Sequence, residues 1–137
     1  MNHKRGFPAF LAAFVFIFLF GFVWHGLLMK SAYMETPALW RPDADFQKHF
    51  GILILGHAII AFAFTGLYVS KIGIHSPATS IGYGIVVGIL TSGVNLIRFA
   101  TEPLTMKILW MWFAGDLICF ALMGAIVGAI YKPKPGY

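Results

Sequence analysis

The chain has 137 residues, of which 59% are hydrophobic and only 11% are charged, and its mean hydropathy is +0.80. Soluble domains carry about 25% charged residues, so this composition excludes a water-soluble globule, and it is too apolar for a disordered chain. The formal net charge of +5 comes from basic residues at the ends of apolar segments. That placement favours a membrane surface over nucleic acid as the partner. The single Cys119 excludes an intrachain disulfide.

Four apolar segments are long enough to cross a bilayer, which takes about 20 residues. We expect helices over residues 7–29, 50–69, 79–99 and 108–131, with a polar loop over 30–49 and two short turns. Short connections make neighbouring helices antiparallel. The sequence therefore predicts an all-α integral membrane protein, a single domain built as a bundle of four antiparallel transmembrane helices.

The charged residues give an expectation for orientation. An even number of spans places both termini on one side, and lysine and arginine are divided equally between the two sides. Glu35, Asp43, Asp45 and Glu102 all fall on the side opposite the termini. We therefore expect cytoplasmic termini. The first helix has no small-residue cleavage site after it, which favours an uncleaved signal-anchor over a signal peptide.

Small residues recur at four-residue spacing in the last two helices. The third helix carries Gly84 and Gly88, and the fourth carries Gly124 and Gly128. Because lipid provides no hydrophobic drive between helices, such stripes allow the close backbone approach that holds them together. We expect contact between helices three and four, with a homodimer face as the alternative.

Five polar residues within the apolar segments fall at similar depth, toward the side opposite the termini: His25, His57, Asn95, Arg98 and Asp116. At 1.5 Å per helical residue, their side chains converge on one layer, and Arg98 meets Asp116 as an ion pair if their helix faces agree. An ionisable residue at such depth is a functional hypothesis by default. We call these five residues the polar layer.

Several roles for the polar layer remain open. It can be structural hydrogen bonding between helices, or a small-molecule, quinone or proton site. His25 and His57 on adjacent helices are also candidates for the two axial ligands of haem b, or with Asp116 for a metal site. No His-Glu-x-x-His, Cys-x-x-Cys or nucleophile-elbow motif is present, so the sequence predicts neither a metal centre nor a catalytic residue.

The loop over 30–49 contains Trp40 and Arg41 between Pro37 and Pro42. Prolines stiffen the chain here, and an indole ring favours the membrane boundary. Trp40 is therefore an interface anchor, a lid over the polar layer or a docking point for a partner.

One part of the sequence is similar to a known group of proteins. The resemblance is carried by FVWHGLLMKSAYMETPALWRP and by Glu102-Pro103 after the third helix. This pattern resembles small bacterial inner-membrane proteins that have four helices and no assigned activity. The resemblance implies a four-helix fold and a bacterial inner membrane, and it carries over no catalytic residues. The small multidrug exporters are a poorer match, because they depend on a glutamate in the first helix.

Three classes of function follow from these features. The first is a non-enzymatic accessory or structural subunit that packs against other membrane proteins, since the chain has little mass outside the bilayer and no complete catalytic set. The second is a small transporter or channel that self-associates and uses the polar layer. The third is a redox module that binds haem or a quinone.

Overall fold

A computed structural model of the protein describes residues 3–72 and 76–131, which form helices joined by short turns, with no strand in those two ranges. Four long helices dominate: α1 (His3–Gly21), α3 (Asp43–Leu67), α4 (Pro77–Thr101) and α5 (Met106–Ile130). Shorter elements are the π-helix η1 (Phe22–Leu28), α2 (Lys30–Tyr33), the 3₁₀ turn η2 (Pro37–Leu39) and the π-helix η3 (Tyr68–Ile72). The predicted all-α, four-helix fold is confirmed.

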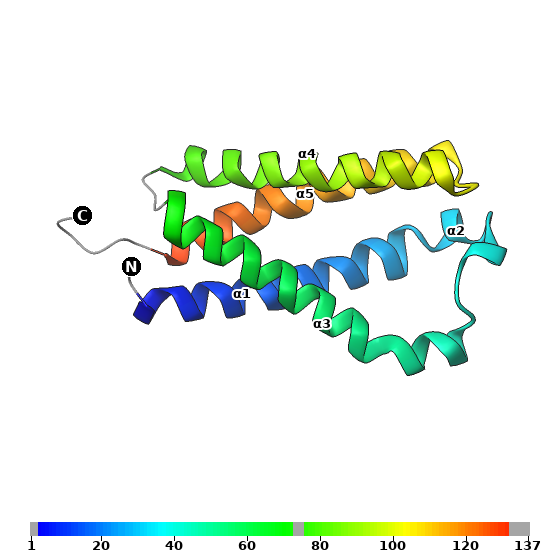
Figure 1. Ribbon diagram of the computed structural model, residues 1–137, viewed down its shortest axis with the longest axis horizontal. Helices are drawn as coiled ribbons and strands as arrows, with labels where there is room; N and C mark the ends of the chain where they lie inside the picture. Colours follow the sequence, from blue (N-terminus) through cyan, green and yellow to red (C-terminus); the bar gives the residue numbers. More distant parts are fainter. Residues whose placement is uncertain (1–2, 73–75, 132–137) are drawn as a thin grey trace.

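Each long helix belongs to a segment long and apolar enough to cross a membrane. These segments are Arg5–Leu28, Asp43–Ser70, Pro77–Thr101 and Met106–Ile130. The start of α1 and the end of α5 lie at the same end of the molecule, and α2 lies at the opposite end, which we call the loop end (Figure 1). The architecture is that of a multi-pass membrane protein.

The second span begins earlier than the sequence indicated. We expected it from residue 50, after a loop over 30–49, but α3 starts at Asp43, and α2 and η2 occupy part of the remaining loop. Pro42 precedes the helix with a φ of −58°, and Asp43 and Asp45 stand in its first turn. Negative charge there interacts favourably with the helix dipole. Hydropathy alone missed these turns because they are polar.

The closest helix contact joins α4 and α5. A Cβ added at Gly84 would meet the backbone carbonyl of Phe120, and one at Gly124 would meet the backbone carbonyl of Ser80. At Gly88 it would lie 3.0 Å from the backbone oxygen of Asp116. The predicted glycine stripes thus lie at this contact, where only glycine permits the two backbones to approach so closely.

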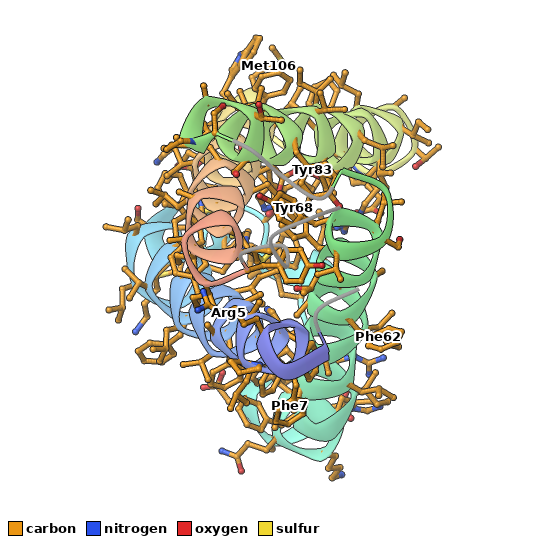
Figure 2. The ribbon with its side chains drawn as sticks, turned by 90° about the vertical axis from the view of Figure 1, so that its left-hand side faces the viewer. Arg5, Phe7, Phe62, Tyr68, Tyr83 and Met106 are labelled. Atoms are coloured by element: carbon orange, nitrogen blue, oxygen red, sulfur yellow. The ribbon has the colours of Figure 1, made fainter. Side chains whose placement is uncertain are left out.

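The helices α1 and α3 pack against each other in the terminal half of the bundle. The buried Ala9, Ala13 and Ile17 of α1 pack in one cluster with Ala61 and Phe64 of α3. In an end-on view, Tyr68 and Tyr83 point into the space between the helices, whereas Phe7 and Phe62 point outward (Figure 2). Toward the loop end α3 diverges from the rest of the bundle (Figure 1).

Two tyrosines fix the terminal end of α3 to α4. The Tyr83 hydroxyl donates to the Phe64 carbonyl oxygen at 2.8 Å, and the Tyr68 and Ser80 hydroxyls are hydrogen-bonded at 2.6 Å. Both bonds lie at the terminal end, and no hydrogen bond in the described ranges joins the loop end of α3 to α4.

We predict that Gly84→Ala destabilises the bundle by about 1–3 kcal/mol, because the new methyl group overpacks a backbone contact that cannot move aside. Gly82→Ala on the same helix is the matched control, since a Cβ there meets nothing within 4 Å. Thermal unfolding of both variants in detergent measures the difference. Equal midpoints for the two would contradict this account of the contact.

Candidate functional site

The loop end of the first span is a widened helical turn. In η1 the backbone bonds reach five residues, as where the Met29 amide donates to the Trp24 carbonyl oxygen at 2.9 Å. Such π turns recur at functional sites, because the additional residue re-aims the side chains that follow. Here the turn presents Trp24 to α5 and His25 to the loop.

An aromatic cluster lies beneath the loop. It consists of Tyr33, Trp40 and Trp112, with ring centroids 4.7 Å apart between Tyr33 and Trp40 and 6.3 Å apart between Trp40 and Trp112. The Trp112 indole donates to the Tyr33 hydroxyl at 2.8 Å. The loop is further anchored by Lys107, which donates to Glu35 at 2.7 Å. Trp40 is thus the member of the cluster that lies nearest the middle of the loop between the first two spans, where it packs on both other rings.

The cluster positions the His25 ring. The indole N–H of Trp112 only donates, so the Tyr33 oxygen accepts from it. The Tyr33 hydroxyl also lies 2.6 Å from His25 Nδ1 and 3.4 Å from the sulfur of Met29. The hydrogen bond between Tyr33 and His25 engages Nδ1 of the imidazole rather than Nε2.

Arg98 lies beside this cluster and not beside Asp116. Its guanidinium is 4.6 Å from the centroid of the Trp112 ring, and its Nε and Nη2 donate to the two carboxylate oxygens of Glu102 at 2.9 and 2.8 Å. These bonds hold the pKa of Glu102 below its ordinary value. Arg98 does not form an ion pair with Asp116. Glu102 follows Arg98 by four residues on the chain and accepts hydrogen bonds from two of its guanidinium nitrogens.

Two other members of the polar layer form a separate pair. Asn95 Nδ2 donates to Asp116 Oδ2 at 2.8 Å across the α4–α5 contact. The polar layer is thus divided. Asn95 and Asp116 lie together, His25 and Arg98 are joined through Tyr33 and Trp112, and the fifth member is His57.

His57 faces α1. Its Nδ1 donates to the Leu53 carbonyl oxygen at 2.8 Å. Its Nε2 lies 3.1 Å from the Cβ position of Gly21. The bare backbone of Gly21 therefore leaves room for the His57 ring beside α1. Axial ligation of haem b by His25 and His57 stays a prediction.

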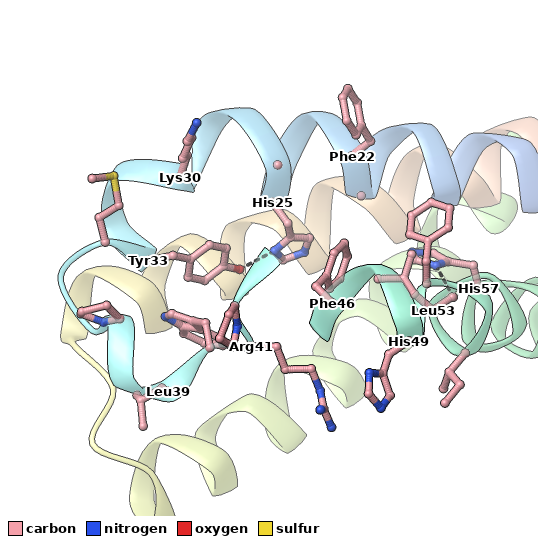
Figure 3. A pocket seen from close by; sticks show the side chains of 18 of the residues that line it. Phe22, His25, Lys30, Tyr33, Leu39, Arg41, Phe46, His49, Leu53 and His57 are labelled. Atoms are coloured by element: carbon pink, nitrogen blue, oxygen red, sulfur yellow. Dashed lines mark hydrogen bonds between the residues drawn. The ribbon is translucent and has the colours of Figure 1, made fainter. Parts of the chain in front are cut away.

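Between α1, α3 and the loop lies a cavity of about 1170 Å³, which we call the α1–α3 groove (Figure 3). Most of its wall is apolar, with phenylalanines from both helices. Its polar lining residues are His25, Lys30, Tyr33, Arg41, His49 and His57. Among the described residues, none of those lining the groove has a carboxylate or carboxamide side chain. In Figure 3, His25 lies between Tyr33 and Phe46.

Three residues at this end were not singled out by sequence reasoning, namely Tyr33, Trp24 and Trp112. The Trp24 indole donates to the Met111 carbonyl oxygen at 3.1 Å and its ring lies on Gly115, where any Cβ would collide with it. The sequence has its four tryptophans, Trp24, Trp40, Trp110 and Trp112, near the side opposite the termini, and this placement alone favours an aromatic belt at the membrane boundary. Only Gly115, one turn from Met111, was a signal that a large ring packs there.

Comparison with protein-family models, with curated proteins and with solved structures found no match to this chain.

We predict that Tyr33→Phe costs about 1–3 kcal/mol at neutral pH, because it leaves the buried indole N–H of Trp112 without an acceptor. Burial raises the pKa of Tyr33 above its ordinary 10.0. The unfolded chain therefore loses this proton first as pH rises above about 10, and the native protein loses stability there. The Tyr33→Phe variant has no hydroxyl that titrates at this position, so it does not lose stability in this way.

The stability gap between the native protein and Tyr33→Phe should then close as pH rises above about 10. Chemical unfolding followed by tryptophan fluorescence at neutral and alkaline pH measures this gap. A gap that is absent at neutral pH, or one that widens in alkali, would contradict the bonding described for Tyr33.

Proposed function

We propose that this protein is a non-enzymatic membrane protein that binds an amphipathic lipid with an anionic head group in the α1–α3 groove. The observation that carries the proposal is the lining of the groove, an apolar wall that ends in a rim of basic and imidazole groups.

The apolar part of the groove suits hydrocarbon chains. Sites for drug-sized ligands occupy about 300–1,000 Å³, and the cavity of about 1170 Å³ exceeds that range. Phe18 and Phe22 of the first span face it together with Phe50 and Leu53 of α3. Because the groove lies between two membrane-spanning helices, acyl or isoprenoid chains enter it directly from the bilayer.

The rim of the groove favours a negative head group. Lys30 and Arg41 lie there with His49, and Lys30 forms no ion pair within the described ranges. Arg41 Nη1 donates to Asp45 Oδ2 at 2.6 Å, and the other N–H groups of its guanidinium are left for a ligand. His25 adds an imidazole group. Phosphate and carboxylate groups match such a set of donors.

The orientation of the protein in the membrane decides from which leaflet the lipid enters the groove. With the termini on the cytoplasmic side of a bacterial inner membrane, as the sequence predicts, the rim lies at the outer surface and the groove takes its lipid from the outer leaflet. The accessory-subunit function uses the same groove, with an apolar helix of a partner protein in the place of the lipid chains. The quinone-binding function differs in that a quinone head is neutral.

Filling the groove should abolish lipid binding. We predict that Leu53→Trp, which places an indole in the wall, removes the lipid retained by the purified protein in native mass spectrometry. Leu55→Trp on the same helix is the matched control, because Leu55 is 58% exposed and does not line the groove. Equal lipid occupancy in both variants would contradict the proposed site.

The charge of the head group is tested separately. Each basic residue near a membrane surface contributes about 1 kcal/mol toward an anionic lipid, so Lys30→Gln with Arg41→Gln should weaken binding of an anionic phospholipid roughly 30-fold. Lys48→Gln, an exposed lysine away from the groove, should leave it unchanged. Undiminished binding of a neutral quinone, or a protein chain bound in place of lipid, would favour the redox module or the accessory subunit instead.

A further inference from the structure

Asp116 is a carboxyl group inside a membrane span with no cation beside it. It lies in the middle of α5, within the segment Met106–Ile130. Among the described residues, no lysine, arginine or histidine nitrogen lies within 4.0 Å of its oxygens, whereas Glu35, Asp45 and Glu102 each have such a partner. An uncompensated carboxylate costs several kcal/mol in a bilayer, so this group needs another source of compensation.

The groups that face Asp116 are neutral. From α4, Asn95 donates to Oδ2 at 2.8 Å, and the hydroxyls of Thr91 and Ser92 lie on the same side of the helix, next to the carboxyl. On α5 itself the nearest titratable side chain is the buried Cys119. From the first span, the Trp24 ring covers the adjacent Gly115. Arg98, one turn beyond Asn95, is engaged by Glu102.

Ser92 completes the surroundings of Asp116. Its side chain is 1% exposed, and its hydroxyl lies next to the Asp116 carboxyl. Among the described residues no other side chain or carbonyl group forms a hydrogen bond with this hydroxyl. Thr91 directs its own proton to the carbonyl oxygens of Val87 and Gly88, at 3.2 and 2.9 Å. Because a serine hydroxyl both donates and accepts, Ser92 can accept a hydrogen from the Asp116 carboxyl or donate one to it.

We propose that Asp116, with Asn95 and Ser92 around it, is a proton-binding site within the membrane. A proton neutralises the carboxylate without further ligands. A metal cation, in contrast, requires a shell of several oxygens, and this place offers one carboxyl, one amide and one free hydroxyl. The site is separate from the α1–α3 groove, whose lining does not include Asp116, and it does not depend on the lipid-binding function.

Infrared spectroscopy of the protein in lipid nanodiscs tests this proposal. At neutral pH we expect a carboxylic-acid C=O stretching band that is absent from Asp116→Asn. Asparagine has the size and neutrality of the protonated acid, so this variant should fold. Asp45→Asn removes an acid that is paired with Arg41, and it should leave the band unchanged.

A second measurement keeps the test independent of the variants. Labelling the native protein with aspartate that carries ¹³C in its side-chain carboxyl should shift the band to lower frequency. An absent band in the folded protein, or a band that labelling does not shift, would overturn the proposal. A band lost when sodium replaces potassium at constant pH would also overturn it, in favour of a metal-cation site.

Discussion

The structure depends on the close approach of α4 to α5. Where Gly84 and Gly124 lie, the backbone of each helix touches the backbone of the other, with no side chain between them. In lipid this contact replaces the hydrophobic effect as the source of helix association, because dispersion forces and backbone dipoles act strongly only at such short range. A pair of helices joined this way is stiff. It therefore forms the base against which the other two helices are placed.

The groove follows from how the other helices meet that base. The first span packs against α5 through Trp24, whose ring fits there because Gly115 has no side chain. By contrast, α3 is joined to α4 by hydrogen bonds only at its terminal end, from Tyr68 and Tyr83. Toward the loop end it has no comparable attachment within the described ranges, and it diverges (Figure 1). The space between α1 and α3 results, and the loop covers its end.

How much of this was predictable differs between the fold and the site. Spans and class follow from hydropathy, which is a local property of the sequence, and glycine spacing indicated which helix faces meet. The site required information that periodicity lacks. The π turn over Phe22–Leu28 breaks the 3.6-residue repeat, so His25 and Trp24 face directions that a regular helix does not give. Arg98 pairs with Glu102, which lies just beyond the end of α4 and therefore outside the apolar segment from which the polar layer was predicted.

The division of the polar layer has an electrostatic consequence. Trp112 lies under Arg98, and Trp24 covers the backbone beside Asp116. Glu102, just beyond the end of α4, holds Arg98 at the loop end. Within the described residues no cation therefore neutralises Asp116. Had Arg98 paired with Asp116, the deep carboxyl would have had a cation as its partner, and Glu102 would have been left as an unpaired negative charge.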